Sequence, residues 1–216
     1  MLLYRFIPLL ALVLQGFLLY LVLRVKGKRG VHRVFSVYLG TMALWGFIIF
    51  GLRNSPNVAA AHVWEQAILP TLVLASFSFF FFTTLFTRRS LSRTTILAIV
   101  ALAGLLMVVS PTPLVLKGMQ LRAYGYAPVF GPLWLLWIAG IYFPLFSSFY
   151  YLYRFYRIAP SADDRNRTLY VLVGILAAFV GGTSDYVAAM GLLPQPGGIY
   201  GNIVFATLAT TAVVRH

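Results

Sequence analysis

The chain contains no cysteine among its 216 residues. Disulfides, zinc–thiolate sites and iron–sulfur clusters are therefore excluded, because each of them needs cysteine sulfur. The three histidines, His32, His62 and His216, are scattered along the chain without the close spacing that a metal site requires. We therefore expect neither a bound metal nor another cofactor.

Acidic residues are also scarce: there are four, against 17 lysines and arginines, which leaves a formal charge of +13. In a soluble protein this excess would favour nucleic acid as a partner. Here the basic residues stand in short clusters between long apolar runs, and hydrophobic residues make up 61% of the sequence. That distribution is typical of a protein embedded in a lipid bilayer, so no nucleic-acid partner is expected.

Long apolar segments dominate the chain. A helix needs about 20 mostly apolar residues to cross the hydrocarbon core of a bilayer. Seven segments approach or meet that length, and neither an internal repeat nor a linker divides them. The sequence therefore predicts one all-α domain over residues 1–216, a polytopic bundle of seven transmembrane helices. The predicted helices cover residues 3–23, 34–52, 67–87, 95–110, 132–153, 162–190 and 199–214.

Basic residues are unequally divided between the two sides of such a bundle. The side that holds the carboxyl terminus has 13 of them and the other side has four. Positive residues stay cytoplasmic, so we expect the amino terminus outside and the carboxyl terminus inside, in the inner (cytoplasmic) membrane. The 13 are Arg24, Lys26, Lys28, Arg29, Arg33, Arg88, Arg89, Arg93, Arg154, Arg157, Arg165, Arg167 and Arg215; the four are Arg5, Arg53, Lys117 and Arg122.

Motifs of membrane enzymes and photoreceptors are missing from the sequence. The last apolar segment has no lysine that could carry a retinal Schiff base, and neither H-E-x-x-H nor G-x-S-x-G occurs. No predicted span contains a histidine to pair with a serine. The chain is therefore not expected to be an enzyme.

Asp185 is the only acid that falls inside the apolar part of a predicted span, which is residues 169–190 for the sixth helix, and an ionisable group there marks a candidate functional site. Around it, Ala177, Gly181 and Ala189 share its helix face, which predicts close packing against a neighbouring helix. Asn202 in the last span should lie at a similar depth, within hydrogen-bonding range. Two alternatives stay open: a ligand-binding carboxylate, or a structural one that caps or pairs near the outer surface.

Four further residues attract attention. Trp45 lies well inside the second span and either lines a pocket or packs, and Tyr186 follows Asp185. Pro70 and Pro144 lie inside the third and fifth spans, where each removes a backbone donor and can act as a hinge. Plain structural roles are the alternative for both prolines.

Two local patterns favour structural roles. Ser161 to Asp164 forms an S-x-x-D capping box, which starts the sixth helix before its apolar part. The outer connection between the fourth and fifth spans carries aromatic residues that an interfacial belt would explain without a ligand. These residues are Tyr124, Tyr126, Trp134 and Trp137.

The carboxyl half combines Arg167-Thr168-Leu169, a run from Gly174 that ends in Gly-Gly-Thr-Ser-Asp at Asp185, Gly191 and the stretch Pro196-Gly197-Gly198-Ile199-Tyr200-Gly201-Asn202. Arg215 follows the last span, and Ala43-Leu44-Trp45-Gly46 lies in the second. This pattern resembles the amino-terminal seven-transmembrane sensor region of bacterial histidine kinases, a region that also precedes diguanylate cyclase domains.

The resemblance implies a membrane-embedded receptor in a two-component system. It would bind a small-molecule or lipid signal in its outer half, with Asp185, Asn202, Trp45 and Tyr186 as lining, and signal through its last helix. The sequence ends at His216 without a phosphoacceptor helix, an ATP-binding domain or a cyclase domain. The output would then come from a longer gene product or from a separate kinase or cyclase partner, unless the fold has been reused.

The alternative function is a transporter of small solutes or lipids. Solute counterflow in liposomes that is abolished by Asp185→Asn would favour that alternative over the receptor. Oligomeric state, including a homodimer, is left open by the sequence.

Overall fold

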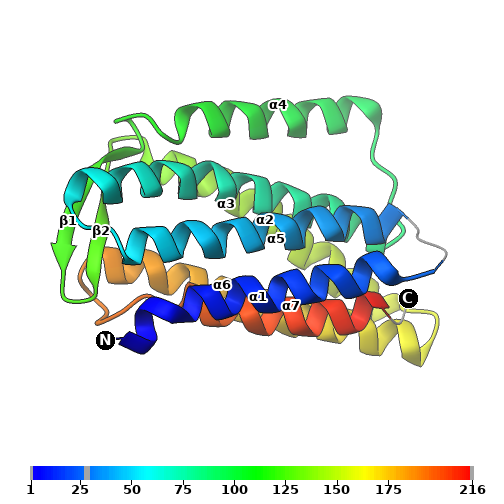
Figure 1. The fold of residues 1–216 in the computed structure, drawn as a ribbon. Helices are drawn as coiled ribbons and strands as arrows, with labels where there is room; N and C mark the ends of the chain where they lie inside the picture. Colours follow the sequence, from blue (N-terminus) through cyan, green and yellow to red (C-terminus); the bar gives the residue numbers. More distant parts are fainter. Residues whose placement is uncertain (1, 27–29, 215–216) are drawn as a thin grey trace.

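The computed structural model describes residues 2–26 and 30–214, and within them the chain forms seven helices and one two-stranded antiparallel sheet (Figure 1). The charged residues Lys28, Arg29 and Arg215, and His216, lie outside the described residues. The helices are α1 (Leu2–Arg24), α2 (Gly30–Arg53), α3 (Val58–Phe86), α4 (Arg93–Val109), α5 (Trp134–Ile158), α6 (Ala162–Ala189) and α7 (Gly198–Val214); the strands are β1 (Leu116–Arg122) and β2 (Gly125–Phe130).

The helices run side by side along one axis, with the two chain termini at opposite ends (Figure 1). Five of the helices are long and apolar enough to cross a membrane, and α4 and α7 are shorter apolar helices. This arrangement confirms the predicted seven-helix bundle. The basic clusters lie towards the end that holds the carboxyl terminus, and from the positive-inside rule we expect that end to be cytoplasmic and the hairpin end external.

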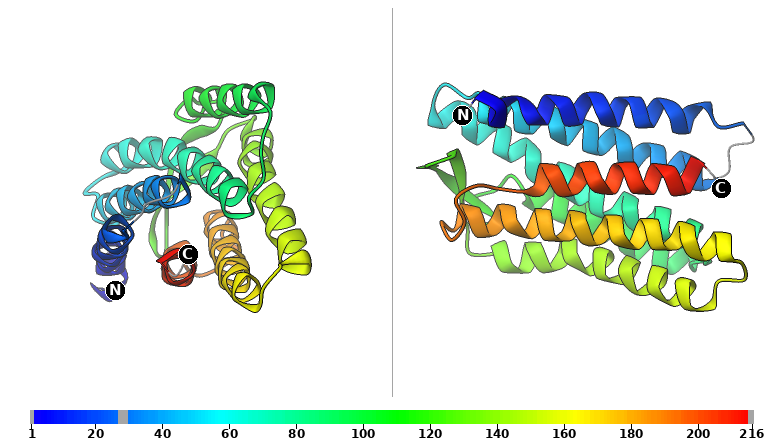
Figure 2. Two further views of the ribbon diagram at one scale, coloured as in Figure 1. Left: turned by 90° about the vertical axis from the view of Figure 1, so that its right-hand side faces the viewer. Right: turned by 90° about the horizontal axis from the view of Figure 1, so that it is seen from below.

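Helix α7 lies between α1 and α6 (Figure 2), and α6 and α7 form the most extensive helix pair in the bundle. Helices α1, α2 and α3 pack in sequence, and α5 joins α3 to α6. Helix α4 stands apart at the edge of the bundle, and Leu106 is its one buried residue. An apolar helix with so little protein contact exposes its side chains to lipid, which is a favourable solvent for them.

Glycine and alanine bring α6 and α7 close together, as the spacing of small residues predicts. A Cβ added to Gly181 would lie 3.2 Å from the Cα atoms of both Gly198 and Gly201. A Cβ added to Gly201 would collide with the backbone oxygen of Ala177. The pair therefore packs backbone against backbone, which is how small residues stabilise helix contacts when lipid removes the hydrophobic driving force.

Helix α3 begins at Val58, well before the predicted start at residue 67. Asn57 caps it, since its side-chain oxygen accepts a hydrogen bond of 2.9 Å from the Ala60 N–H. Polar residues in the first turns lower the local hydropathy, which is why the apolar pattern excludes them. The expectation that Asp185 is the only acid within a span is therefore wrong: Glu65 lies on α3 and is buried.

A β-hairpin forms the outer connection between α4 and α5, with Ala123 and Tyr124 in its turn. It is tied to the outer end of α6, where Arg122 Nη2 donates to the Ala189 carbonyl oxygen at 3.2 Å. Trp134 and Trp137 are buried beside it, and Trp137 Nε1 donates to Ser110 Oγ at 2.8 Å. The belt interpretation is therefore wrong for these two tryptophans, because they pack inside the protein.

The start of α6 agrees with the predicted cap. Ser161 Oγ accepts a hydrogen bond of 3.0 Å from the Asp164 N–H. The Asp164 carboxylate in turn lies 3.5 Å from Arg88 Nη2, which joins the cytoplasmic ends of α3 and α6. Asp163 is exposed in the first turn, where its charge meets the positive end of the helix dipole. Both acids thus have structural roles.

Candidate functional site

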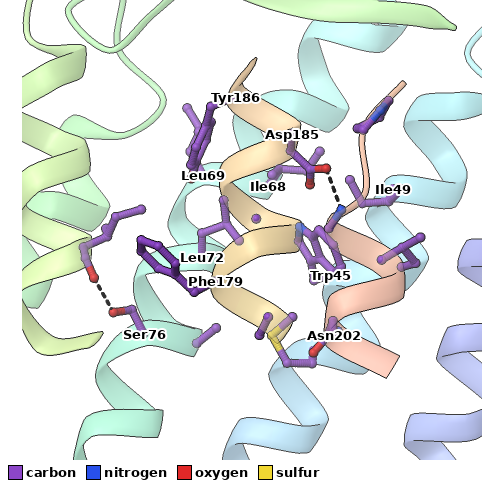
Figure 3. A pocket seen from close by; sticks show the side chains of 18 of the residues that line it. Trp45, Ile49, Ile68, Leu69, Leu72, Ser76, Phe179, Asp185, Tyr186 and Asn202 are labelled. Carbon is purple, nitrogen blue, oxygen red and sulfur yellow. Dashed lines mark hydrogen bonds between the residues drawn. The ribbon is translucent and has the colours of Figure 1, made fainter. Parts of the chain in front are cut away.

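A cavity of about 340 Å³ lies in the outer part of the bundle, between the hairpin and the middle of the helices. This volume is at the lower end of the range typical of small-molecule sites, which are mostly apolar with a few polar groups. Figure 3 shows Trp45, Leu69, Phe179, Asp185, Tyr186 and Asn202 arranged around it. Its walls come from α2, α3, α5, α6 and α7, its outer cover comes from β2 and the hairpin turn, and Tyr4 of α1 lies at its edge.

Asp185 is partly buried at the outer end of this cavity, where α6 meets the start of α7. Its Oδ1 accepts a hydrogen bond of 2.7 Å from the Gly198 N–H, the first backbone donor of α7 (Figure 3). The preceding Ser184 Oγ accepts from the Gly197 N–H at 2.9 Å. The carboxylate therefore caps α7 from a neighbouring helix and faces its positive dipole end. Asp185 thus both caps a helix and lines the cavity.

Asn202 lies one helical turn deeper on α7 and does not share a hydrogen bond with Asp185 in the described structure. Its Oδ1 accepts a long hydrogen bond of 3.5 Å from the Tyr38 hydroxyl of α2. The expected hydrogen bond between Asp185 and Asn202 does not form, because the Asp185 carboxylate instead accepts from the free N–H of Gly198 at the start of α7. The Asn202 Nδ2 atom is buried without a partner among the described residues. It is therefore a donor available at the cavity wall.

Trp45 and Tyr186 also line the cavity. Trp45 is buried on α2, and its Nε1 atom has no hydrogen-bond partner within the described part of the chain. Tyr186 packs edge-on against Trp134, with the two ring centroids 4.9 Å apart. The structure thus brings all four sequence-predicted residues to one cavity. Their role in binding stays a prediction.

Glu65 completes the polar lining, and its side chain is only 5% exposed. It lies close enough to Asp185 for the two carboxyls to interact electrostatically. Within the described residues, neither a hydrogen bond nor an ion pair engages its carboxyl group. A buried acid without a partner is costly to the fold, because its charged form has lost its hydration.

Arg53 and Tyr4 form the edge of the cavity on the side of α1 and α2. Arg53 Nη1 donates to the Tyr4 carbonyl oxygen at 2.6 Å, and its guanidinium carbon lies 3.7 Å from the centre of the Tyr4 ring.

In the hairpin turn, burial raises the pKa of the Tyr124 hydroxyl to about 12, so that side chain stays neutral. The hairpin contributes Tyr124, Gly125, Tyr126, Pro128 and Phe130 to the lining.

Pro70 and Pro144 lie inside α3 and α5 as expected. Pro144 is buried, and its carbonyl oxygen accepts a hydrogen bond of 2.7 Å from Ser148 Oγ. On α3, Ser76 Oγ donates to the Ile141 carbonyl oxygen of α5 at 2.6 Å, and both residues line the cavity (Figure 3). The action of the two prolines as hinges stays a prediction.

An aromatic cluster closes the cavity towards the cytoplasm. We call it the aromatic column: its members come from α2, α3 and α7 and contact one another in series. Tyr38 and Phe79 form the cavity floor, and the column ends against Phe155 of α5, 6.5 Å from Phe86. The column consists of Phe35, Tyr38, Phe79, Phe82, Phe86 and Phe205.

The sequence analysis missed Glu65 and the β-hairpin that covers the cavity, although the sequence near each of them carries a local signal for its structure. Asn57 before Ala59-Ala60-Ala61 is a helix start that would have placed Glu65 on α3. Met119-Gln120-Leu121-Arg122 alternates apolar and polar residues, which is the period of a strand. Among the described residues, no group of three or more His, Asp or Glu side chains could hold a metal ion.

Comparison with known protein families gives a match. The family model described as the N-terminal 7TM region of histidine kinase matches residues 7–214, almost the whole chain. No curated protein matches it in sequence. The family region is a membrane sensor, distinct from the catalytic domain of a kinase, and it agrees with the apolar helices and the seven-helix bundle.

Proposed function

Since this chain belongs to the family of N-terminal seven-transmembrane regions of histidine kinases, we propose that it is a bacterial signal receptor of the inner membrane. It binds a small signal molecule in the outer cavity and transmits binding to a cytoplasmic output domain or partner. The single observation that supports this most strongly is the cavity itself, which brings Asp185, Glu65, Trp45 and Asn202 from four helices to one place.

Helices α6 and α7 are the elements best placed to carry the signal. Both line the cavity at their outer ends, and both continue to the cytoplasmic end of the bundle. Their backbones are in close contact, so a ligand that moves one helix also moves the other. The ligand must bind two arrangements of this pair with different affinities, because equal affinities would shift nothing.

The aromatic column supports a receptor over the alternative transporter. A transporter must open its site to both sides of the membrane, whereas bulky rings fill the bundle below this cavity. Counterflow of a solute in liposomes containing the chain, abolished by Asp185→Asn, would favour transport. Absence of counterflow with intact folding is the result that we expect.

Filling the cavity should mimic a bound signal. Gly182 lines the cavity, and a Cβ placed there meets nothing within 4 Å, so the side chain of Gly182→Trp would start in open space at the cavity. The chain has no cysteine, so the pair Arg165→Cys and Val214→Cys can carry two spin labels at the cytoplasmic ends of α6 and α7. In nanodiscs, Gly182→Trp should shift the distance between the labels by about 1–2 Å, as in other helix-shift switches.

The matched control is Gly104→Trp, a glycine on lipid-facing α4 that also has open space around it. Its label distances should coincide with those of the unmodified double-cysteine chain. Coincident distances for Gly182→Trp as well would contradict coupling between the cavity and the cytoplasmic ends.

A further inference from the structure

The uncompensated carboxyl of Glu65 is the starting observation. Two acids, Glu65 and Asp185, line the cavity, and Asp185 is already engaged with the start of α7. Glu65 is 95% buried and unpaired within the described residues, with its carboxyl at the cavity wall. Such a group favours a ligand that supplies a positive charge or a proton donor.

The basic residue that lines the cavity, Arg53, is engaged by Tyr4. Arg53 lines the cavity, but its guanidinium donates to the Tyr4 carbonyl oxygen and stacks on the Tyr4 ring. Within the described residues, the one ion pair closer than 4 Å joins Arg88 and Asp164, at the opposite end of the bundle. With both acids ionised, the cavity lining carries one more negative charge than positive charges.

Aromatic rings surround these acids. Tyr124 and Tyr186 lie within electrostatic range of Glu65, and Trp45, Tyr126 and Trp134 line the same cavity. Aromatic faces attract organic cations, and the attraction strengthens when water is excluded. Carboxylate and ring faces together are therefore typical of a site for an ammonium group.

One side of the cavity faces the bilayer. On the outer side, the hairpin covers the cavity with Tyr124, Tyr126 and Pro128. On the side of α5 and α6, Phe146 and Leu176 both line the cavity and are 56% and 53% exposed, so the cavity wall there is also part of the outer surface of the bundle. These two residues lie about halfway along α5 (Trp134–Ile158) and α6 (Ala162–Ala189), at a depth where hydrocarbon surrounds the bundle.

On α6, the polar and apolar parts of the cavity lining are separated along the axis. Asp185 lies near the outer end of α6, and Leu176 lies nine residues deeper, about 13 Å at the usual rise per residue. Between these levels the α6 lining is apolar, with Ala178, Phe179 and Gly182, while Asn202 of α7 contributes a polar group to the lining. A ligand with one polar end and one apolar chain matches this gradient.

We infer that the cavity binds an amphiphilic organic cation that enters from the lipid. Its ammonium group lies beside Glu65 and the aromatic rings, and its chain points towards the lipid-facing wall at α5 and α6. This inference rests on the proposed function, because it names the ligand class of the same cavity.

The test compares three probes with equal chain length and different charge: decyltrimethylammonium, decanol and decanoate. Binding to the chain in phosphatidylcholine nanodiscs is followed by tryptophan fluorescence, since Trp45 and Trp134 line the cavity. Empty nanodiscs correct for partition into lipid. The cation should bind at least about tenfold more tightly than decanol, equivalent to 1.4 kcal/mol, and decanoate should bind most weakly.

Glu65→Gln is the decisive variant, because it keeps the size of the side chain and removes the charge. It should weaken the cation at least about tenfold and leave decanol within about twofold of the unmodified chain. Asp163→Asn, an exposed acid outside the cavity, should change neither affinity. Thermal unfolding without probe should show that Glu65→Gln is at least as stable as the unmodified chain, because the amide has no charged form whose lost hydration the fold must offset.

Equal binding of cation and decanol, an unchanged cation affinity in Glu65→Gln, or no saturable binding of any probe would each overturn the inference. In those cases the distances measured for Gly182→Trp still report separately on the proposed function. The two experiments therefore distinguish an error in the inferred ligand class from an error in the proposed receptor function.

Discussion

Replacing Gly201 by alanine is expected to lower the free energy of unfolding by about 3 kcal/mol, at the upper end of the usual cost of overpacking. The new methyl group would collide with the backbone oxygen of Ala177. A flexible side chain could rotate away, but a helix backbone cannot move without shifting its whole helix. The variant must therefore separate α6 from α7. Steric trapping in bicelles measures this free energy directly.

The matched control is Gly182→Ala on α6, where the added methyl group enters open space at the cavity. It should be neutral or stabilising by up to about 1 kcal/mol, because alanine favours a helix more than glycine does. The same comparison tests signalling: spin labels at residues 165 and 214 should report a wider α6–α7 pair in Gly201→Ala. An unchanged stability and distance would show that the two helices are less closely packed than described.

Asp185→Ala is expected to destabilise the chain by about 2 kcal/mol, within the range for a lost hydrogen bond to a charged group. The substitution leaves the buried Gly198 N–H without its acceptor and removes a negative charge from the positive end of α7. The loss should be concentrated in the first turn of α7. Hydrogen exchange of the amides of residues 198–201 should accelerate by at least about tenfold.

Asp163→Ala serves as the control, since it removes an exposed acid from the first turn of the same α6 helix. It should cost less than about 1 kcal/mol and leave exchange at residues 198–201 unchanged. Asp185→Asn keeps an acceptor oxygen in place, so it should recover part of the protection lost in Asp185→Ala. Normal protection of the α7 start in Asp185→Ala would contradict the capping role.

The dual position of Asp185 affects how functional experiments are interpreted. A loss of signalling in an Asp185 variant has two sources, because the residue both caps α7 and lines the cavity. Glu65 is free of this ambiguity, since none of the described residues depends on its carboxyl for a hydrogen bond. Glu65 is therefore the better residue for separating ligand recognition from the structure of the α6–α7 pair.

Local composition alone was sufficient to predict that the chain spans a membrane, that it has seven helices, and which end of the bundle faces the cytoplasm. These properties depend on sums over neighbouring residues: the apolar content of a segment and the number of arginines in the loop beside it. The small-residue face of α6 was also predictable, because residues four apart share a face in any helix. The Ser161 cap of α6 was predictable because Ser161 and Asp164 interact within one turn.

The tertiary structure decided which residues surround the cavity. Glu65 lies in a stretch that hydropathy excludes from the span, and only the complete α3 brings it to the same cavity as Asp185. Asp185 binds Gly198 rather than Asn202, because the end of a neighbouring helix offers a free N–H that no pairwise spacing reveals. The cavity combines five helices and a hairpin from distant parts of the chain. Its shape therefore depends on long-range packing, which local periodicity does not encode.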